Sequence, residues 1–89
     1  MRNKKTGAWG NWKTGTIMIP RKGKEKIVAK YEVKQYDKGS KYGINGGRIS
    51  KLHVTMEDKT VINYDRGWDI EPKTEEEEIC LCILLNDYN

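Results

Sequence analysis

Residues 42–52 read Tyr-Gly-Ile-Asn-Gly-Gly-Arg-Ile-Ser-Lys-Leu, and the rest of the chain is organised around this stretch. Asn45-Gly46 is the strongest hairpin signal in the sequence, because asparagine and glycine both tolerate the positive φ angles of a type I′ turn. It predicts that residues 42–44 pair with residues 47–49. The apolar, β-branched run that follows predicts a continuing strand. We therefore expect antiparallel strands at the centre of the fold.

Further strands are predicted before this stretch. Residues 12–19 form a first strand that Pro20 is expected to end, because proline cannot donate to a strand ladder. Residues 21–24 are then a hairpin loop. The clearest strand follows, because its residues alternate between apolar and polar with a period of two; its inward side is Ile27, Ala29, Tyr31 and Val33.

Two strands and a helix are predicted after it. Residues 50–56 should turn Leu52, Val54 and Met56 inward, and after a turn at residues 57–59 a strand covers residues 60–64. Thr74 and Glu77 form a capping box, and four consecutive glutamates suit the first turn of a helix. We expect its apolar face to be Ile79, Cys82, Ile83 and Leu85 or Asn86, widened by Cys80, Leu81 and Leu84.

These elements predict an α+β fold. It is an antiparallel sheet of four or five strands, arranged as a meander, with one C-terminal helix packed on one face. Its 89 residues, of which 36% are hydrophobic, suit one small domain with a thin core. We place that domain at residues 9–89, after a basic, flexible tail at residues 1–8.

The net charge of +4 is unevenly distributed along the chain. Residues 1–30 carry nine lysines and arginines against one glutamate, whereas residues 70–89 carry one lysine against six acidic residues. Such polarity suggests a basic face for anionic partners and an acidic edge. The alternative is that both charged ends are simply solvated.

The sequence gives little support to metal, redox or enzyme chemistry. Cys80 and Cys82 are two residues apart, so on a helix they cannot pair or share a metal, and we interpret both as core residues of a cytoplasmic protein. His53 is the only histidine, and no serine or cysteine has a recognisable base partner. We expect no catalytic residues, no metal and no cofactor. The longest apolar run, residues 79–85, is too short to cross a bilayer.

The glycine-rich stretch is the first candidate site. Its glycines allow backbone amides to approach an anion, and Arg48 and Lys51 could supply charge, with His53 on the same outward face as Lys51. The alternative is that Asn45-Gly46-Gly47 only builds a tight hairpin. The spacing is not that of a Walker loop or a dinucleotide fingerprint.

A second unusual stretch, residues 63–69, reads Asn-Tyr-Asp-Arg-Gly-Trp-Asp. Asp65, Asp69 and Glu71 could be metal ligands, but the alternatives are an Asx-type turn and an ion pair of Arg66 or Arg48 with a neighbouring acid. Aromatic residues interleaved with basic ones could also form a stacking platform for bases. We expect Trp12, Tyr31 and Trp68 to be structural and Trp9, Tyr36 and Tyr42 to be exposed.

Residues 42–52, residues 63–69 and the closing Tyr88-Asn89 resemble a small uncharacterised domain, a domain of unknown function, of Firmicutes and their phages and mobile elements. The resemblance covers roughly residues 9–89. It implies no activity, but it does imply a phage or mobile-element setting. Small proteins in that setting often act by binding, for example by blocking host defence complexes or sequestering their nucleotide signals.

The expected function is therefore non-catalytic binding, with a counter-defence or regulatory purpose in the cytoplasm of the host bacterial cell. The partner would be an anionic ligand, a nucleic acid or a host defence protein, and we expect no membrane. The predicted contacts are a stacking ring, two backbone donors and four charges: Tyr42, Gly46, Gly47, Arg48, Lys51, His53 and Arg66. The alternatives are a DNA- or RNA-binding module that uses the basic N-terminal third, and a metal-dependent nuclease. Open sheet edges also predict a homodimer.

Overall fold

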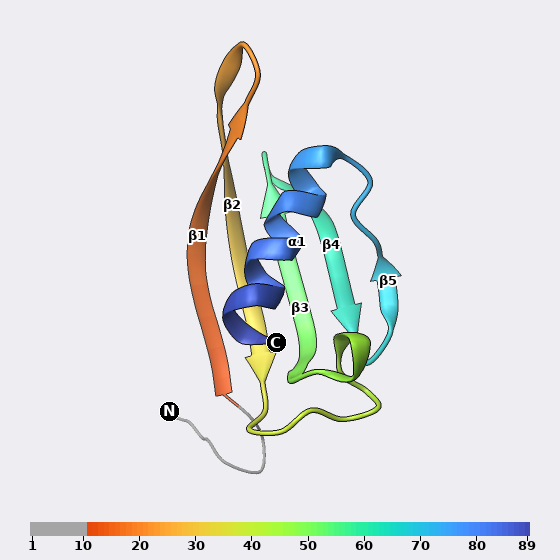
Figure 1. Ribbon diagram of the computed structural model, residues 1–89. Coiled ribbons are helices and arrows are strands. Elements are labelled where there is room, and N and C mark those ends of the chain that lie inside the picture. The colour runs from red at the N-terminus through yellow and green to blue at the C-terminus, as the bar shows by residue number, and fades with distance from the viewer. Residues whose placement is uncertain (1–10) are drawn as a thin grey trace.

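The computed structural model describes residues 11–89 and confirms the predicted α+β meander. Five antiparallel strands pair in chain order, and one helix lies across one face of the sheet (Figure 1). The predicted basic tail at residues 1–8, and Trp9, lie outside the described residues. The elements are β1 (Asn11–Arg21), β2 (Lys24–Gln35), the 3₁₀ turn η2 (Ile44–Gly46), β3 (Ile49–Met56), β4 (Lys59–Asp65), β5 (Trp68–Ile70) and α1 (Glu75–Tyr88).

The β1–β2 hairpin is the longest part of the sheet, and its tip projects beyond the other strands (Figure 1). Pro20 does not end β1 as predicted but lies inside it, where the pairing is irregular between Ile19 and Arg21. A proline is tolerated there because β1 is an edge strand of the sheet. The predicted loop is confirmed, and it is closed by Gly23 at a φ of +65°.

The β3–β4 hairpin has an unusual turn for its sequence. Met56 pairs with Lys59, so Glu57 and Asp58 are the two turn residues, and their φ angles are +50° and +64°. Two positive φ angles are typical of a type I′ turn, which strongly prefers Asn-Gly because other residues pay a steric penalty there.

Replacing Glu57-Asp58 by Asn-Gly is therefore expected to raise the free energy of unfolding by about 1 kcal/mol. Urea denaturation followed by circular dichroism measures this change. Gly23→Ala is the matched control in the other hairpin, and it should lower the stability by about 1 kcal/mol, because it forces a side chain into the same backbone region. A loss of stability in the Asn-Gly variant would contradict the interpretation.

The predicted hairpin at Asn45-Gly46 is wrong, although the predicted turn is present. Asn45 and Gly46 have φ angles of +54° and +74°, and the Gly47 N–H donates to the Ile44 carbonyl at 2.8 Å. No strands flank this turn, because β3 begins at Ile49 and pairs with β2. The turn instead forms part of the long connection between β2 and β3, and a strand that was not predicted, β5, extends the sheet at its other edge.

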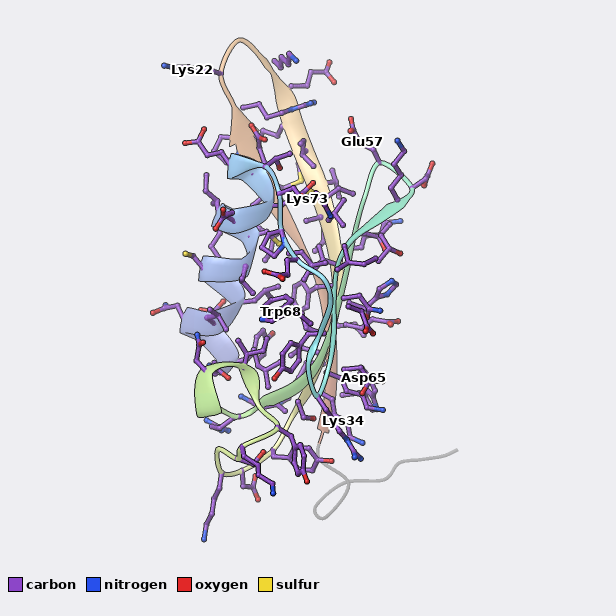
Figure 2. The ribbon with its side chains drawn as sticks, turned by 90° about the vertical axis from the view of Figure 1, so that its right-hand side faces the viewer. Lys22, Lys34, Glu57, Asp65, Trp68 and Lys73 are labelled. Carbon is purple, nitrogen blue, oxygen red and sulfur yellow. The ribbon has the colours of Figure 1, made fainter. Side chains whose placement is uncertain are left out.

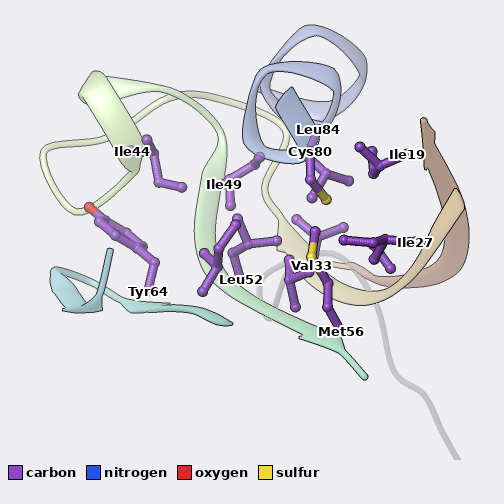
Figure 3. Packing of buried hydrophobic residues seen from close by; sticks show 13 residues of the cluster. Ile19, Ile27, Val33, Ile44, Ile49, Leu52, Met56, Tyr64, Cys80 and Leu84 are labelled. Carbon is purple, nitrogen blue, oxygen red and sulfur yellow. The ribbon is translucent and has the colours of Figure 1, made fainter. Parts of the chain in front are cut away.

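The core lies between the sheet and α1 (Figure 3). The predicted inward residues Ile27, Ala29, Val33, Leu52, Val54 and Met56 are all buried there. The predicted capping box at the start of α1 is also confirmed.

The predicted apolar face of α1 is only partly correct: Leu81, Ile83 and Leu85 pack against the core as expected, but two of the predicted residues do not face it and the fully buried residues are ones that the prediction used only to widen the face. The buried residues of α1 are Cys80 and Leu84, while Ile79 is 37% exposed and Cys82 is exposed. Almost every residue from 79 to 85 is apolar, so the sequence pattern did not define a single face. Burial raises the pKa of the Cys80 thiol to about 11, as suits a core residue. Cys82 was also predicted to lie in the core, but it is exposed.

The C-terminal end of α1 is fastened to the sheet by hydrogen bonds. The hydroxyls of Tyr31 and Tyr88 lie 2.8 Å apart, and this bond is the main reason that the pKa of Tyr31 is raised to about 12. The Gln35 side chain donates to the Tyr88 carbonyl at 2.7 Å. Asn89 accepts from the Ile49 N–H at 3.0 Å and donates to the Ile44 carbonyl at 2.9 Å. The helix end therefore holds β2, β3 and the η2 turn together.

The other face of the sheet, here called the open face, is turned away from α1 (Figure 2). Trp12 belongs to it and is 55% exposed, so its predicted place in the core is wrong. Trp68 is also 38% exposed and packs edge-on against Tyr64 at the border of the sheet. Within residues 11–89, no helix has the length and apolar character needed to cross a membrane.

Candidate functional site

A groove of about 630 Å³ lies at the end of the sheet where the β2–β3 connection meets the β4–β5 turn. We call it the loop groove. One strand, β3, and two loops contribute to its lining, which consists of Tyr36, Asp37, Lys38, Ser40, Tyr42, Ser50, Lys51 and Arg66. Its size is in the range of small-ligand sites.

Backbone hydrogen bonds fix the parts of the loop groove relative to one another. The Arg66 N–H donates to the Ser50 carbonyl at 3.0 Å, which ties the β4–β5 turn to β3. The buried Tyr64 hydroxyl donates to the Tyr42 carbonyl at 2.8 Å, which ties the β2–β3 connection to β4. The groove is therefore built on paired strands, and its side chains do not depend on one free loop.

Cations and an aromatic ring lie together in the groove. The Arg66 guanidinium is 5.6 Å from the centre of the Tyr42 ring, and the Lys41 ammonium lies 5.2 Å from the same ring. Lys51 extends from β3 and its ammonium is 3.7 Å from the Asp65 carboxylate. Both groups of that ion pair are partly exposed, so the pair holds Lys51 only weakly.

Ser50 is the most unusual residue of the groove. It is 5% exposed, and its hydroxyl has no hydrogen-bond partner among the described residues. A register shift explains its orientation: Lys34 pairs with Lys51 and Gln35 with Ile49, so Ser50 is an extra residue in β3. Such bulges re-aim side chains next to functional sites. A buried polar group without a partner is costly, so the bulge orients Ser50 at the expense of stability.

Arg66 has a strained backbone. Its φ angle is +61°, a backbone conformation that glycine and asparagine adopt at a lower energetic cost than arginine. A non-glycine residue in this region costs of the order of 1 kcal/mol or more. The strain places the guanidinium over the Tyr42 ring, which suggests that the side chain is needed there.

The seven predicted site residues separate into two groups. Tyr42, Lys51 and Arg66 line the loop groove together. Arg48 is half-buried, and its Nε donates to the Tyr36 carbonyl at 2.9 Å, so it braces the β2–β3 connection. The N–H groups of Gly46 and Gly47 donate to Gly43 and Ile44 within the turn. These N–H groups are already used, so we leave both glycines out of the proposed site.

Gly47 has a different purpose, because a side chain there would collide with the Asn89 amide. A side chain at Gly43 would likewise collide with the Gly47 carbonyl. The glycines thus allow the connection to close around Asn89. They are structural, as in the alternative interpretation of this stretch, although the tight hairpin which that interpretation expected is absent.

His53 lies on the open face, away from the loop groove. Its Nε2 is 2.9 Å from the Thr60 hydroxyl and its Nδ1 is 3.8 Å from the Glu32 carboxylate. The order resembles a carboxylate–imidazole–hydroxyl relay, which the sequence did not reveal because Glu32, His53 and Thr60 lie on three different strands and meet only through strand pairing. The Glu32 distance exceeds a hydrogen bond, and both side chains are well exposed. We interpret the group as a cross-strand polar cluster.

The sequence singled out Asp65, Asp69 and Glu71 as alternative metal ligands. Asp65 lies beside Lys51, and Asp69 accepts a long hydrogen bond, 3.5 Å, from the Asn63 amide. Over residues 11–89, no three His, Cys, Asp or Glu side chains gather into a group that could hold a metal ion.

The sequence did not identify Ser50 as a groove residue, nor did it place Lys34 beside the groove residue Lys51. Neither has a signal of its own in the sequence, since the orientation of Ser50 depends on the bulge and that of Lys34 on its register opposite Lys51. The Lys34 ammonium lies 5.6 Å from the Tyr36 ring and 6.0 Å from the Trp12 ring. A pattern of alternating lysines and aromatic residues was the only hint.

Neither the search of curated proteins nor the search of solved structures found a match. Residues 11–89 match the family described as a domain of unknown function (DUF7678), and the chain belongs to that family.

Proposed function

We propose that the protein is a non-catalytic binding domain that takes an anionic partner in the loop groove. The observation that carries this proposal is the meeting of Arg66, Lys51 and the Tyr42 ring in one groove, with the Arg66 guanidinium 5.6 Å from the centre of that ring. Two cations favour a phosphate or carboxylate, and the ring offers a face for stacking.

The backbone strain at Arg66 supports the proposal. If position 66 contributed only to stability, a residue that favours a positive φ angle would be expected there. Arginine instead adds backbone strain and holds a cation over the Tyr42 ring. Asp37 and Asp65 lie in or beside the groove and reduce its positive potential. We therefore expect selective binding of modest affinity, since the groove is not a broad basic surface.

Arg66→Asn gives a sharp test, because asparagine tolerates the φ angle and the variant should fold at least as well as the natural protein. We expect it to weaken binding about ten-fold, which corresponds to the loss of one charge-assisted contact. The probes are thymidine monophosphate, a decathymidylate oligonucleotide and poly-glutamate, each titrated into ¹⁵N-labelled protein at low salt. The amide signals of Ser50, Lys51 and Arg66 should move.

Lys59→Ala is the matched control, since Lys59 is an exposed cation at the opposite end of β4. It should leave binding unchanged. The proposal fails if none of the three probes moves the signals of the groove. It also fails if the signals move only at the β1–β2 tip, around Lys22 and Lys24, as the alternative of a basic N-terminal third predicts.

We further propose a counter-defence or regulatory role in a phage or mobile element, exerted in the cytoplasm of the host bacterial cell. The support is the resemblance of residues 42–52 and 63–69 to a domain of that setting, together with a groove suited to anions. Expression of the protein in bacteria that carry nucleotide-signalled defences should raise the plating efficiency of phage, and Arg66→Asn should abolish the increase. Unchanged plating on all such hosts would contradict the role.

Self-association is also proposed. β1 is an eleven-residue edge strand, and among the described residues no strand pairs with its outer side. Unpaired edges of this length template pairing with another copy. Light scattering over a range of concentrations should give the mass of a dimer, and a constant monomer mass would exclude it.

A further inference from the structure

We propose that the anionic partner is a single-stranded nucleic acid. It crosses the open face at the end of the sheet where β1 begins, and it runs from Trp12 to the loop groove. The inference rests on the proposed function, because one end of the strand occupies the groove. The inference adds a second contact region to the loop groove, the Trp12–Lys34–Tyr36 cluster. This second region is what specifies the class of ligand.

The pairing of the strands creates a continuous row of side chains on the open face. Trp12 pairs with Lys34, Lys34 with Lys51, and Lys51 with Asp65, so one residue from each of β1 to β4 lies in this row. Directly opposed residues of antiparallel strands lie on the same face. Figure 2 shows Lys34 and Asp65 on the side of the sheet that is turned away from α1, and Lys51 of β3 lies between them in the pairing order.

Two lysines directly opposite each other are unfavourable in a sheet. Lys34 and Lys51 are so placed, and each has a different neighbour: Lys34 lies near two aromatic rings and Lys51 lies near Asp65. Neither neighbour removes the positive charge of the pair. A phosphate between the two ammonium groups would relieve their repulsion.

Aromatic rings flank this pair of lysines on both sides. On one side are Trp12, 55% exposed, and Tyr36, both within 6.0 Å of the Lys34 ammonium. On the other side is Tyr42, 47% exposed, beneath Arg66. Proteins that bind single strands combine a basic track with rings on which bases stack, and each stacked base contributes about 1–3 kcal/mol.

The length of the row favours an oligonucleotide over a single nucleotide. Three strand spacings of about 4.8 Å separate β1 from β4, so the row is about 14 Å long. One nucleotide can reach one aromatic region, whereas a short strand can reach both. A duplex is excluded from the stacking contacts because its bases are already paired and stacked.

The row predicts a weak dependence on salt. The cations that we expect to contact phosphates are Lys34 and Lys51 in the row and Arg66 in the loop groove, and Glu32 and Asp65 lie on the same face. Three phosphate contacts on a single strand give a log–log slope of about −2. A protein that relied on the basic hairpin and the N-terminal residues would give a steeper slope.

The experiment uses the full chain and fluorescence anisotropy with labelled decathymidylate, together with thymidine monophosphate followed by NMR. Trp12→Ala should weaken oligonucleotide binding about five-fold or more, because it removes one stacking contact. It should leave the binding of thymidine monophosphate to the groove unchanged. Trp12 is exposed, so the variant should keep the melting temperature of the natural protein.

Lys34→Ala should have the same effects as Trp12→Ala. Arg66→Asn should weaken the binding of both decathymidylate and thymidine monophosphate. The double variant Lys22→Ala/Lys24→Ala, at the tip of the β1–β2 hairpin, is the control and should change neither. The inference fails, and the loop groove proposal survives, if decathymidylate binds no more tightly than the monophosphate or if Trp12→Ala has no effect on it. Equal affinity for a duplex of the same length, lost in the hairpin variant, would also overturn it. Binding of poly-glutamate alone would point to an acidic protein surface instead.

Discussion

Leu84→Ala is expected to lower the free energy of unfolding by about 3 kcal/mol. Leu84 is 1% exposed, and it faces the sheet together with Cys80, as Figure 3 shows. These two are the buried residues of α1, so the helix depends on them for its position. The truncation removes buried methyl groups and leaves a cavity beneath the helix, whose other large core-facing residues (Leu81, Ile83, Leu85 and Tyr88) are only partly buried. Urea denaturation measures the change.

Ile79→Ala is the matched control within the same helix. Ile79 is 37% exposed, and alanine has the higher helix propensity, so the loss should stay below about 1 kcal/mol. The apolar face expected from the sequence had Ile79 among its central residues and Leu84 only among the residues that widen it. Equal losses in the two variants, or a larger loss for Ile79→Ala, would show that the helix is rotated relative to the structure described here.

Asn89→Ala is expected to lower the free energy of unfolding by about 2 kcal/mol. The Asn89 side chain accepts from the Ile49 N–H and donates to the Ile44 carbonyl, and both of these isoleucines are buried. The Ile44 carbonyl keeps its bond from Gly47, but the variant leaves the Ile49 N–H without this acceptor. A buried backbone donor without a partner costs most of its desolvation energy.

Asn86→Ala is the control for this second prediction, because Asn86 is exposed on α1 and alanine suits a helix better. It should be neutral or slightly stabilising. Hydrogen exchange gives a local readout, since the Ile49 amide should lose protection in Asn89→Ala and keep it in Asn86→Ala. An unchanged exchange rate at Ile49 would contradict the proposed lock.

These two predictions concern the support beneath the candidate site. Asn89 holds the η2 turn against β3, and β3 carries Ser50 and Lys51 into the loop groove. Asn89→Ala should therefore weaken binding as well, although Asn89 does not line the groove. A variant that lost stability but kept full affinity would show that the groove is held by the Arg66–Ser50 and Tyr64–Tyr42 bonds alone.

The sequence by itself determined the elements whose signals are local. Period-two alternation in residues 27–34 and 50–56 defined two strands and their inward sides, and Thr74 with Glu77 defined the start of the helix. Alternation and capping are local because each depends on residues within a few positions of one another. The positive φ angles at Asn45-Gly46 were predicted for the same reason.

Only the tertiary structure decided what these elements do together. By its sequence, the Asn45-Gly46 turn could belong to a hairpin or to a longer connection between strands. Its place in the β2–β3 connection depends on hydrogen bonds from Asn89, which is distant along the chain. The face of α1 was undetermined because residues 79–85 are apolar almost all round, so the sheet selected Cys80 and Leu84. The groove depends on a one-residue bulge that brings Ser50 and Lys51 toward Arg66. Register between strands is a property of pairs of segments, and a single segment does not contain it.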